Sequence, residues 1–278
     1  MPFDAAPPAG GNSESQWIII YLCILTPMSR THIAASYRER RDLWKGEWGC
    51  SYAADFKKNE VAPLIEEIEA AGRLGRVLLD AGSGSLIGPG SAARPKPILY
   101  PLEGKLVVRT DIAMPYLSRV SGPILELQAD IENLSADSAS QRRRLLAISR
   151  HLGIDPRIRR PEFNAMFFFD VLNYVDFRRT LAGLLPFLSG DGRMIISNFP
   201  GMGIPEAFSD SGVKSNGELS GFLRDCGMLI EHLYHPPLVH PFFAYAVASR
   251  PAYPNLTDNP QERGSMVLVA VREPSLSA

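Results

Sequence analysis

Four aspartates stand where apolar runs of the sequence end, and this placement indicates a ligand site. Asp80, Asp111, Asp130 and Asp170 each close or follow a stretch rich in Val, Ile, Leu or Phe, a composition typical of strands buried in a parallel sheet. The carboxyl ends of such strands meet at one edge of an open α/β sheet, where ligands bind. A carboxylate at this edge can accept hydrogen bonds from two donors at once.

A glycine-containing turn follows the first of these acids. Residues 77–84 read V-L-L-D-A-G-S-G, which predicts a buried strand that ends abruptly in a tight loop. Gly82 and Gly84 can adopt positive φ angles, and without side chains they let the backbone lie against a ligand. The pattern alone has low specificity, so its interpretation depends on the segments that follow.

Those segments alternate between strand and helix patterns, as a doubly wound sheet requires. We expect strands over 106–111, 124–131, 163–169, 193–198, 228–234 and 266–271, and helices over 59–72, 135–152, 177–188 and 215–226. The glycines and prolines of residues 85–105 exclude a long helix there and predict an extended loop. Residues 190–192 read as a turn.

In this order the motifs resemble those of the class I S-adenosylmethionine-dependent methyltransferases. Asp80, Gly82 and Gly84 match the family's first motif, and residues 170–175, D-V-L-N-Y-V, resemble its fourth. The resemblance covers residues 74–273. It implies an α/β fold with a Rossmann-like, doubly wound, seven-stranded sheet, mostly parallel with an antiparallel last strand, and an N-terminal helical cover. Residues 1–28 would be a disordered or partner-packed extension, and 29–73 a helical lid.

The resemblance also assigns roles at the edge of the sheet, with S-adenosylmethionine as cofactor. The turn after the first strand would hold the methionine part, the acid of the second strand the ribose, and the acid of the third strand or its neighbour the adenine. The fourth strand would end against the sulfonium and the acceptor. The cofactor-binding residues implied are Asp80, Ala81, Gly82, Ser83, Gly84, Asp111, Ile112, Asp130, Ile131 and Asp170.

Two of these acids have a simpler interpretation. Asp111 could cap a helix over residues 114–120, because aspartate is a favoured N-cap residue. Asp130 could be an ordinary solvated loop acid. The position of Asp111 at a strand end favours the ribose role.

Methyl transfer itself needs an acceptor aligned in line with the methyl group, and a hydroxyl or acid acceptor must also lose its proton. His240, in the aromatic segment His240-Pro-Phe-Phe, is the candidate base, and Tyr174 is placed to orient an acceptor. The alternative for His240 is a loop histidine with a structural hydrogen bond.

We therefore expect O- or N-methylation of a small molecule, in specialised metabolism. The alternative is a methyltransferase-like protein that binds the cofactor without methyl transfer, as a cyclase or binding module. A nicotinamide dehydrogenase is disfavoured because Ile87 occupies the place of the third glycine and Asp111 lies too far along the chain.

The composition gives no reason to expect a nucleic-acid or membrane partner. The 29 basic and 30 acidic side chains give no reason to expect nucleic acid, and the three cysteines, spaced far apart, suit a reducing, cytoplasmic compartment and form no metal site. The apolar run over 17–25 is far shorter than the roughly 20 residues that cross a bilayer. We expect it to pack in the core or on a partner chain, such as a second copy in a homodimer. Translation from Met28 is the alternative for this segment.

Overall fold

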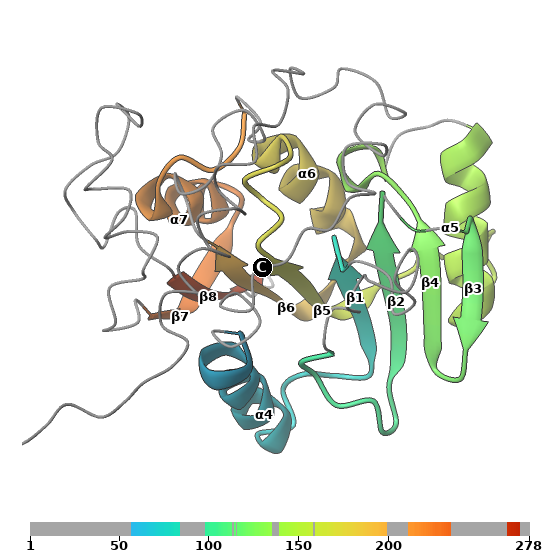
Figure 1. The fold of residues 1–278 in the computed structure, drawn as a ribbon, viewed down its shortest axis with the longest axis horizontal. Helices are drawn as coiled ribbons and strands as arrows, with labels where there is room; N and C mark the ends of the chain where they lie inside the picture. Colours follow the sequence, from blue (N-terminus) through green and yellow to red (C-terminus); the bar gives the residue numbers. More distant parts are fainter. Residues whose placement is uncertain are drawn as a thin grey trace, which may run out of the picture.

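An eight-stranded sheet forms the centre of the molecule, in the order β3-β4-β2-β1-β5-β6-β8-β7 (Figure 1). The computed structural model describes residues 57–83, 98–112, 114, 116–134, 139–157, 159–198, 211–234 and 266–272. Its strands are β1 (Val77–Ala81), β2 (Leu106–Asp111), β3 (Ser118–Ser121), β4 (Ile124–Gln128), β5 (Phe163–Phe169), β6 (Leu188–Asn198), β7 (Met228–Tyr234) and β8 (Met266–Arg272).

The central strands run in one direction. β4, β2, β1, β5 and β6 are parallel to their neighbours, and β8 lies antiparallel between β6 and β7. The predicted Rossmann-like sheet, mostly parallel with an antiparallel last strand, is thereby confirmed. Because parallel strands end at the same edge, the carboxyl ends of β4, β2, β1 and β5 lie side by side.

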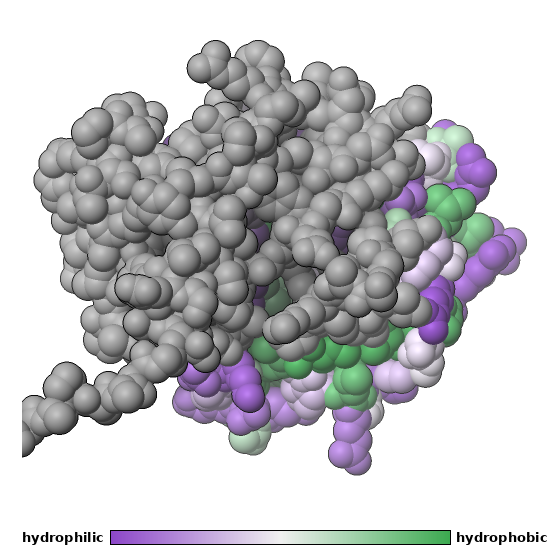
Figure 2. Space-filling view, viewed as in Figure 1, coloured by the Kyte–Doolittle hydropathy of each residue, from purple (hydrophilic) through white to green (hydrophobic). Residues whose placement is uncertain are grey.

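The strand number was predicted one too low, because β3 forms a hairpin with β4. Ser121 pairs with Ile124, and Gly122 takes a φ of 56° in the two-residue turn between them, a conformation that suits tight hairpins. Residues 118–121 therefore form an edge strand instead of continuing the helix that we considered over 114–120. Leu117, just before β3, and Val120 within it are 73% and 62% exposed. Figure 2 shows hydrophobic and hydrophilic surfaces side by side at this end of the sheet.

Strand β6 also differs from its prediction. Residues 190–192 were expected to form a turn before the strand, yet β6 begins at Leu188. Leu188 pairs with Phe163 and Arg193 with Ala165, so the intervening residues of β6 bulge from the ladder. A glycine-rich bulge interrupts a strand without ending it, and it leaves a turn-like sequence signature.

Two apolar cores lie on the two faces of the sheet, because side chains alternate along each strand. Leu79, Val108 and Phe168 pack with α5 (Ala139–His151), α6 (Phe177–Leu184) and α7 (Asn216–Asp225). Leu78, Val107 and Phe167 pack on the other face with α4 (Ala62–Ala70), which lies apart from the other three helices in Figure 1. The short helical turns are η1 (Lys57–Val61), η2 (Ile131–Asn133) and η3 (Leu185–Phe187).

Two helices show the local signals that the sequence analysis used, whereas α6 ends at Leu184, earlier than the predicted residue 188. Pro63 stands in the first turn of α4, and Gly72 follows its end with a φ of 69°. The Ser215 side chain accepts a hydrogen bond from the backbone of Glu218 and caps α7. Among the helices that the structure describes, none has the length and apolar composition needed to span a membrane.

The division into an extension, a lid and an α/β domain stays a prediction. Every described strand lies within 74–273, and η1 and α4 belong to the part expected to be a lid. Residues 1–56, which hold the rest of the lid and the apolar run over 17–25, lie outside the described residues.

Candidate functional site

The four aspartates found in the sequence gather at one edge of the sheet. Asp111 ends β2, Asp80 is the last residue but one of β1, and Asp170 directly follows β5. Asp130 lies two residues beyond the end of β4. These strands are neighbours in the sheet, so the acids lie at one edge, as the sequence predicts. The environments of the four carboxylates differ from one another.

The turn after β1 can be built only with glycine. Gly82 has a φ of 70°, and a Cβ atom there would lie 2.4 Å from Cγ2 of Val171. The backbone N–H groups of Gly82 and Ser83 both donate to the carbonyl oxygen of Thr110, at 2.8 and 3.0 Å. These two amides therefore fasten the turn to β2. The Ala81 side chain is buried in the core, and Gly84 lies outside the described residues.

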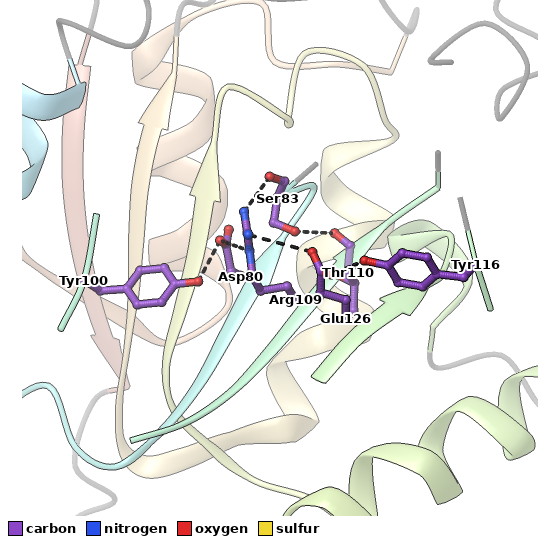
Figure 3. Close-up of polar contacts among 7 residues, drawn as sticks. All are labelled: Asp80, Ser83, Tyr100, Arg109, Thr110, Tyr116 and Glu126. Atoms are coloured by element: carbon purple, nitrogen blue, oxygen red, sulfur yellow. Dashed lines mark hydrogen bonds and ion pairs between the residues drawn. The ribbon is translucent and has the colours of Figure 1, made fainter. Parts of the chain in front are cut away.

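Asp80 faces a buried cation. Its Oδ2 accepts a hydrogen bond from the hydroxyl of Tyr100 at 2.9 Å and one from Nε of Arg109 at 3.3 Å (Figure 3). Burial, and then the charge of Asp80, raise the pKa of Tyr100 well above its ordinary value. The phenol is therefore a neutral donor to the carboxylate throughout the physiological pH range.

Arg109 continues this network towards the turn and towards β4. Its Nη2 donates to the carbonyl oxygen of Ser83 at 2.9 Å, and its Nη1 lies 3.9 Å from Oε1 of Glu126. Glu126 in turn accepts a hydrogen bond from the hydroxyl of Tyr116 (Figure 3). Neither Arg109 nor Glu126 was predicted from the sequence, although an ionisable residue inside each of two strands with apolar neighbours is a recognisable signal.

Asp111 and Asp130 have different surroundings. Asp111 is half-buried, and its carbonyl oxygen accepts a hydrogen bond from Ala129; the residues described after it form β3 and not a helix, so its alternative role as a helix cap is wrong. Asp130 is 2% exposed and not the solvated acid of the alternative interpretation. Its carboxylate accepts hydrogen bonds from the backbone of Glu132 and from the side chain of Asn133, and in this way Asp130 caps η2. The ribose and adenine roles, with Ile112 and Ile131, stay predictions.

Asp170 has the most unusual backbone and charge environment of the four acids. Its φ of 53° lies in the left-handed region, which residues with a side chain rarely adopt, although aspartate and asparagine tolerate it better than the others. The Nζ atom of Lys57, from η1, lies 2.5 Å from its Oδ2, and both side chains are largely buried. No pattern in the sequence marks Lys57. Strained backbone and buried charge are typical of functional sites.

The chain after Asp170 adds polar groups at the same place. The side-chain amide of Asn198, at the end of β6, donates to Asn173 at 2.9 Å, and both residues are buried. Oδ1 of Asn198 has no hydrogen-bond partner within the described ranges. Tyr174, half-buried, lies next to this pair in the chain, whereas His240 lies outside the described residues. No cluster of metal-ligating side chains is found in the part of the chain that can be described.

A cavity of about 650 Å³ lies elsewhere in the molecule. Arg157, Arg159, Arg160 and Phe187 are among the residues that line it. These residues precede β5 or follow α6, so the cavity lies towards the amino ends of the parallel strands. None of the four aspartates borders it.

Comparison with known proteins gives matches among solved structures. No protein-family model matches the chain, and no curated protein matches it in sequence. The 1,6-didemethyltoxoflavin-N1-methyltransferase of Burkholderia thailandensis, solved with S-adenosylhomocysteine, has a TM-score of 0.46 at 17% identity over 98% of this chain and 94% of that chain. A putative methyltransferase from Thermobifida fusca YX also has a TM-score of 0.46, at 15% identity over 82% of this chain and 85% of that one.

A third similar structure is the N-methyltransferase NodS from Bradyrhizobium japonicum WM9 in complex with S-adenosyl-l-homocysteine. Its TM-score is 0.45 at 9% identity, over 86% of this chain and 99% of that chain.

Proposed function

We propose that this chain is an S-adenosylmethionine-dependent methyltransferase that transfers the methyl group to oxygen or nitrogen of a small molecule. The observation that carries the proposal is the joint arrangement at the carboxyl edge of the sheet. Four acids end four adjacent parallel strands, and the turn after β1 has no space for a side chain at Gly82. Ligands of open α/β folds bind at this edge.

The residues present fit the chemistry of this cofactor. A half-buried carboxylate at Asp111 suits a pair of ribose hydroxyl donors, and the turn at Gly82 allows a ligand to approach the backbone. The Asp130 carboxylate already caps η2, so the adenine would bind through the neighbouring backbone of Ile131. The cofactor would supply an activated methyl group on a sulfonium.

The protein's own contribution to transfer is alignment. Asp170 brings a carboxylate to the end of β5, where the resemblance places the positive sulfonium, and Lys57 holds that carboxylate in position. Tyr174 follows four residues later on the same exit from the strand and would orient the acceptor. His240 would remove a proton from an acidic acceptor. Most of the rate gain would come from holding acceptor and methyl group in line.

Binding of the cofactor is the first test. Titration calorimetry with S-adenosylmethionine and with S-adenosylhomocysteine should give micromolar or tighter dissociation constants for the purified protein. A panel of phenols, carboxylic acids and amines would then reveal methylated products by mass spectrometry. Tight binding without any product across the panel would favour the alternative of a cofactor-binding protein that transfers no methyl group. A folded protein that binds neither compound would overturn the proposal.

Replacing Asp111 by alanine should weaken cofactor binding by about 1–3 kcal/mol, because the ribose donors would lose their acceptor. The measurement is the dissociation constant for S-adenosylhomocysteine. Asp155 provides a matched control: it is an acid in the loop between α5 and β5, and its partner is Arg157. Asp155→Ala should leave affinity unchanged, and an unchanged affinity in Asp111→Ala would refute the ribose role.

A further inference from the structure

We infer that Arg109 is a positioning residue that holds the turn after β1 in the geometry needed for cofactor binding. The inference deepens the proposed function and rests on it. Arg109 does not end a strand and reaches the turn only through its long side chain, whose Nη2 donates to the carbonyl oxygen of Ser83. It acts through the turn and not by touching the cofactor.

The register of the sheet brings Arg109 between two acids. Asp80 lies opposite Arg109 in the β1–β2 ladder, and Arg109 lies opposite Glu126 in the β2–β4 ladder. Directly paired residues of neighbouring strands point to the same face. The three side chains therefore form a row across three strands, and none of them is more than 3% exposed.

Stability alone does not explain a buried arginine at this position. Moving a guanidinium and two carboxylates out of water is costly, and apolar side chains of similar size often serve a core equally well. The contacts are also uneven, since Nη1 lies 3.9 Å from Glu126 and has no hydrogen-bond partner in the described part of the chain. The well-formed contact is the one from Nη2 to the turn, at 2.9 Å.

That contact fixes one peptide group of the turn. The N–H of Ser83 donates to Thr110 on one side, and its C=O accepts from Arg109 on the other. Because a peptide group is planar, binding its carbonyl oxygen sets the direction of the whole unit that leaves Ser83. In the absence of Arg109 the Ser83 carbonyl loses this buried donor, and the direction of the unit is less firmly fixed.

Two tyrosines hold the outer acids of the row in place. Tyr100 donates to Asp80 and stacks on Phe167, with ring centroids 4.7 Å apart. Tyr116 donates to Glu126 from the opposite side (Figure 3). The guanidinium therefore lies between two carboxylates that are themselves anchored, which aligns it towards Ser83.

The test uses the double variant Arg109→Met with Glu126→Gln. This variant keeps the formal charge of the row, because it removes one cation and one anion together. We expect it to fold with a lowered unfolding temperature, because Asp80 stays buried without its cation. At temperatures where it is folded, it should bind S-adenosylhomocysteine roughly 10- to 100-fold more weakly, the effect of one lost hydrogen bond to a charged group. Tyr116→Phe is the control, since it removes a hydrogen bond from the same row but leaves the contact with Ser83 intact. It should bind as the wild type does.

Hydrogen exchange gives a second measurement that does not depend on the cofactor. Amides of residues 80–83 should exchange faster in the double variant, while those of α7 should not change. Arg109→Lys retains the positive charge. It lacks the planar guanidinium, whose Nε and Nη2 contact Asp80 and Ser83 at the same time. It should show the same faster exchange, and it can be measured if the double variant fails to fold.

The possible outcomes separate the two claims. If the wild type binds neither S-adenosylmethionine nor S-adenosylhomocysteine, the proposed function fails, and the exchange of residues 80–83 alone decides whether Arg109 fixes the turn. If the wild type binds and the folded double variant binds equally well, the positioning role is wrong. Unchanged exchange in both Arg109 variants overturns it as well.

Discussion

Replacing Lys57 by methionine should lower the free energy of unfolding by about 3 kcal/mol, because removal of one partner from a buried ion pair leaves the other charge without compensation. Nζ of Lys57 lies 2.5 Å from Oδ2 of Asp170, and the two side chains are 10% and 14% exposed. This small exposure gives an expected effect at the lower end of the range for fully buried pairs. Urea denaturation followed by circular dichroism measures the change.

A double-mutant cycle isolates the pair. Asp170→Asn retains a residue type that tolerates positive φ, so it removes the charge without adding backbone strain. The double variant Lys57→Met with Asp170→Asn should be more stable than Lys57→Met alone, because it buries no unpaired charge. The exposed pair of Arg157 and Asp155, in which the arginine is 89% exposed, supplies the control: Arg157→Met should have no measurable effect. Wild-type stability in Lys57→Met would contradict the importance of the pair.

Strand β2 shows what the sequence could predict. Its bounds agree with the structure at both ends, because three apolar residues, Leu106-Val-Val, begin it and an acid, Asp111, ends it. The same argument located β1, β4 and β5. It also placed the four acids at one edge of the sheet, because a residue that ends a parallel strand in the sequence lies at the carboxyl edge of the sheet in the fold.

Strand β3 shows what the sequence could not predict. Ser118–Ser121 is exposed along its whole length and has no apolar alternation. Its pairing depends on the neighbouring strand β4 and on the turn at Gly122. An edge strand of this kind has no buried face to leave a pattern, so its sequence was open to interpretation as a helix.

The environments of the acids could not be predicted from the sequence either. Arg109 and Glu126 are visible as charged residues in apolar strands, but only the register shows that both lie in one row with Asp80. Asp170 was predicted at the end of its strand, whereas its partner Lys57 comes from η1, far away in the chain. These are tertiary contacts, which local patterns do not encode.

Replacing Gly82 by alanine should be the most damaging single substitution in the turn. A side chain at a φ of 70° costs about 1–2 kcal/mol, and the new Cβ would lie 2.4 Å from Val171 Cγ2, which adds about 1–3 kcal/mol of overpacking. Displacement of the turn from Thr110 should also abolish measurable binding of S-adenosylhomocysteine. Denaturant midpoints and titration calorimetry test both effects.

Gly72 separates the two causes. It has nearly the same φ, 69°, but no atom lies within 4 Å of a Cβ placed there, so Gly72→Ala should show the backbone cost alone and bind the cofactor normally. The variant Gly82→Ala with Val171→Ala should recover part of the lost stability, because the nearest clashing atom is gone. If Gly82→Ala were no less stable than Gly72→Ala, the close contact with Val171 would not constrain the turn, and the requirement for glycine would reduce to its backbone conformation.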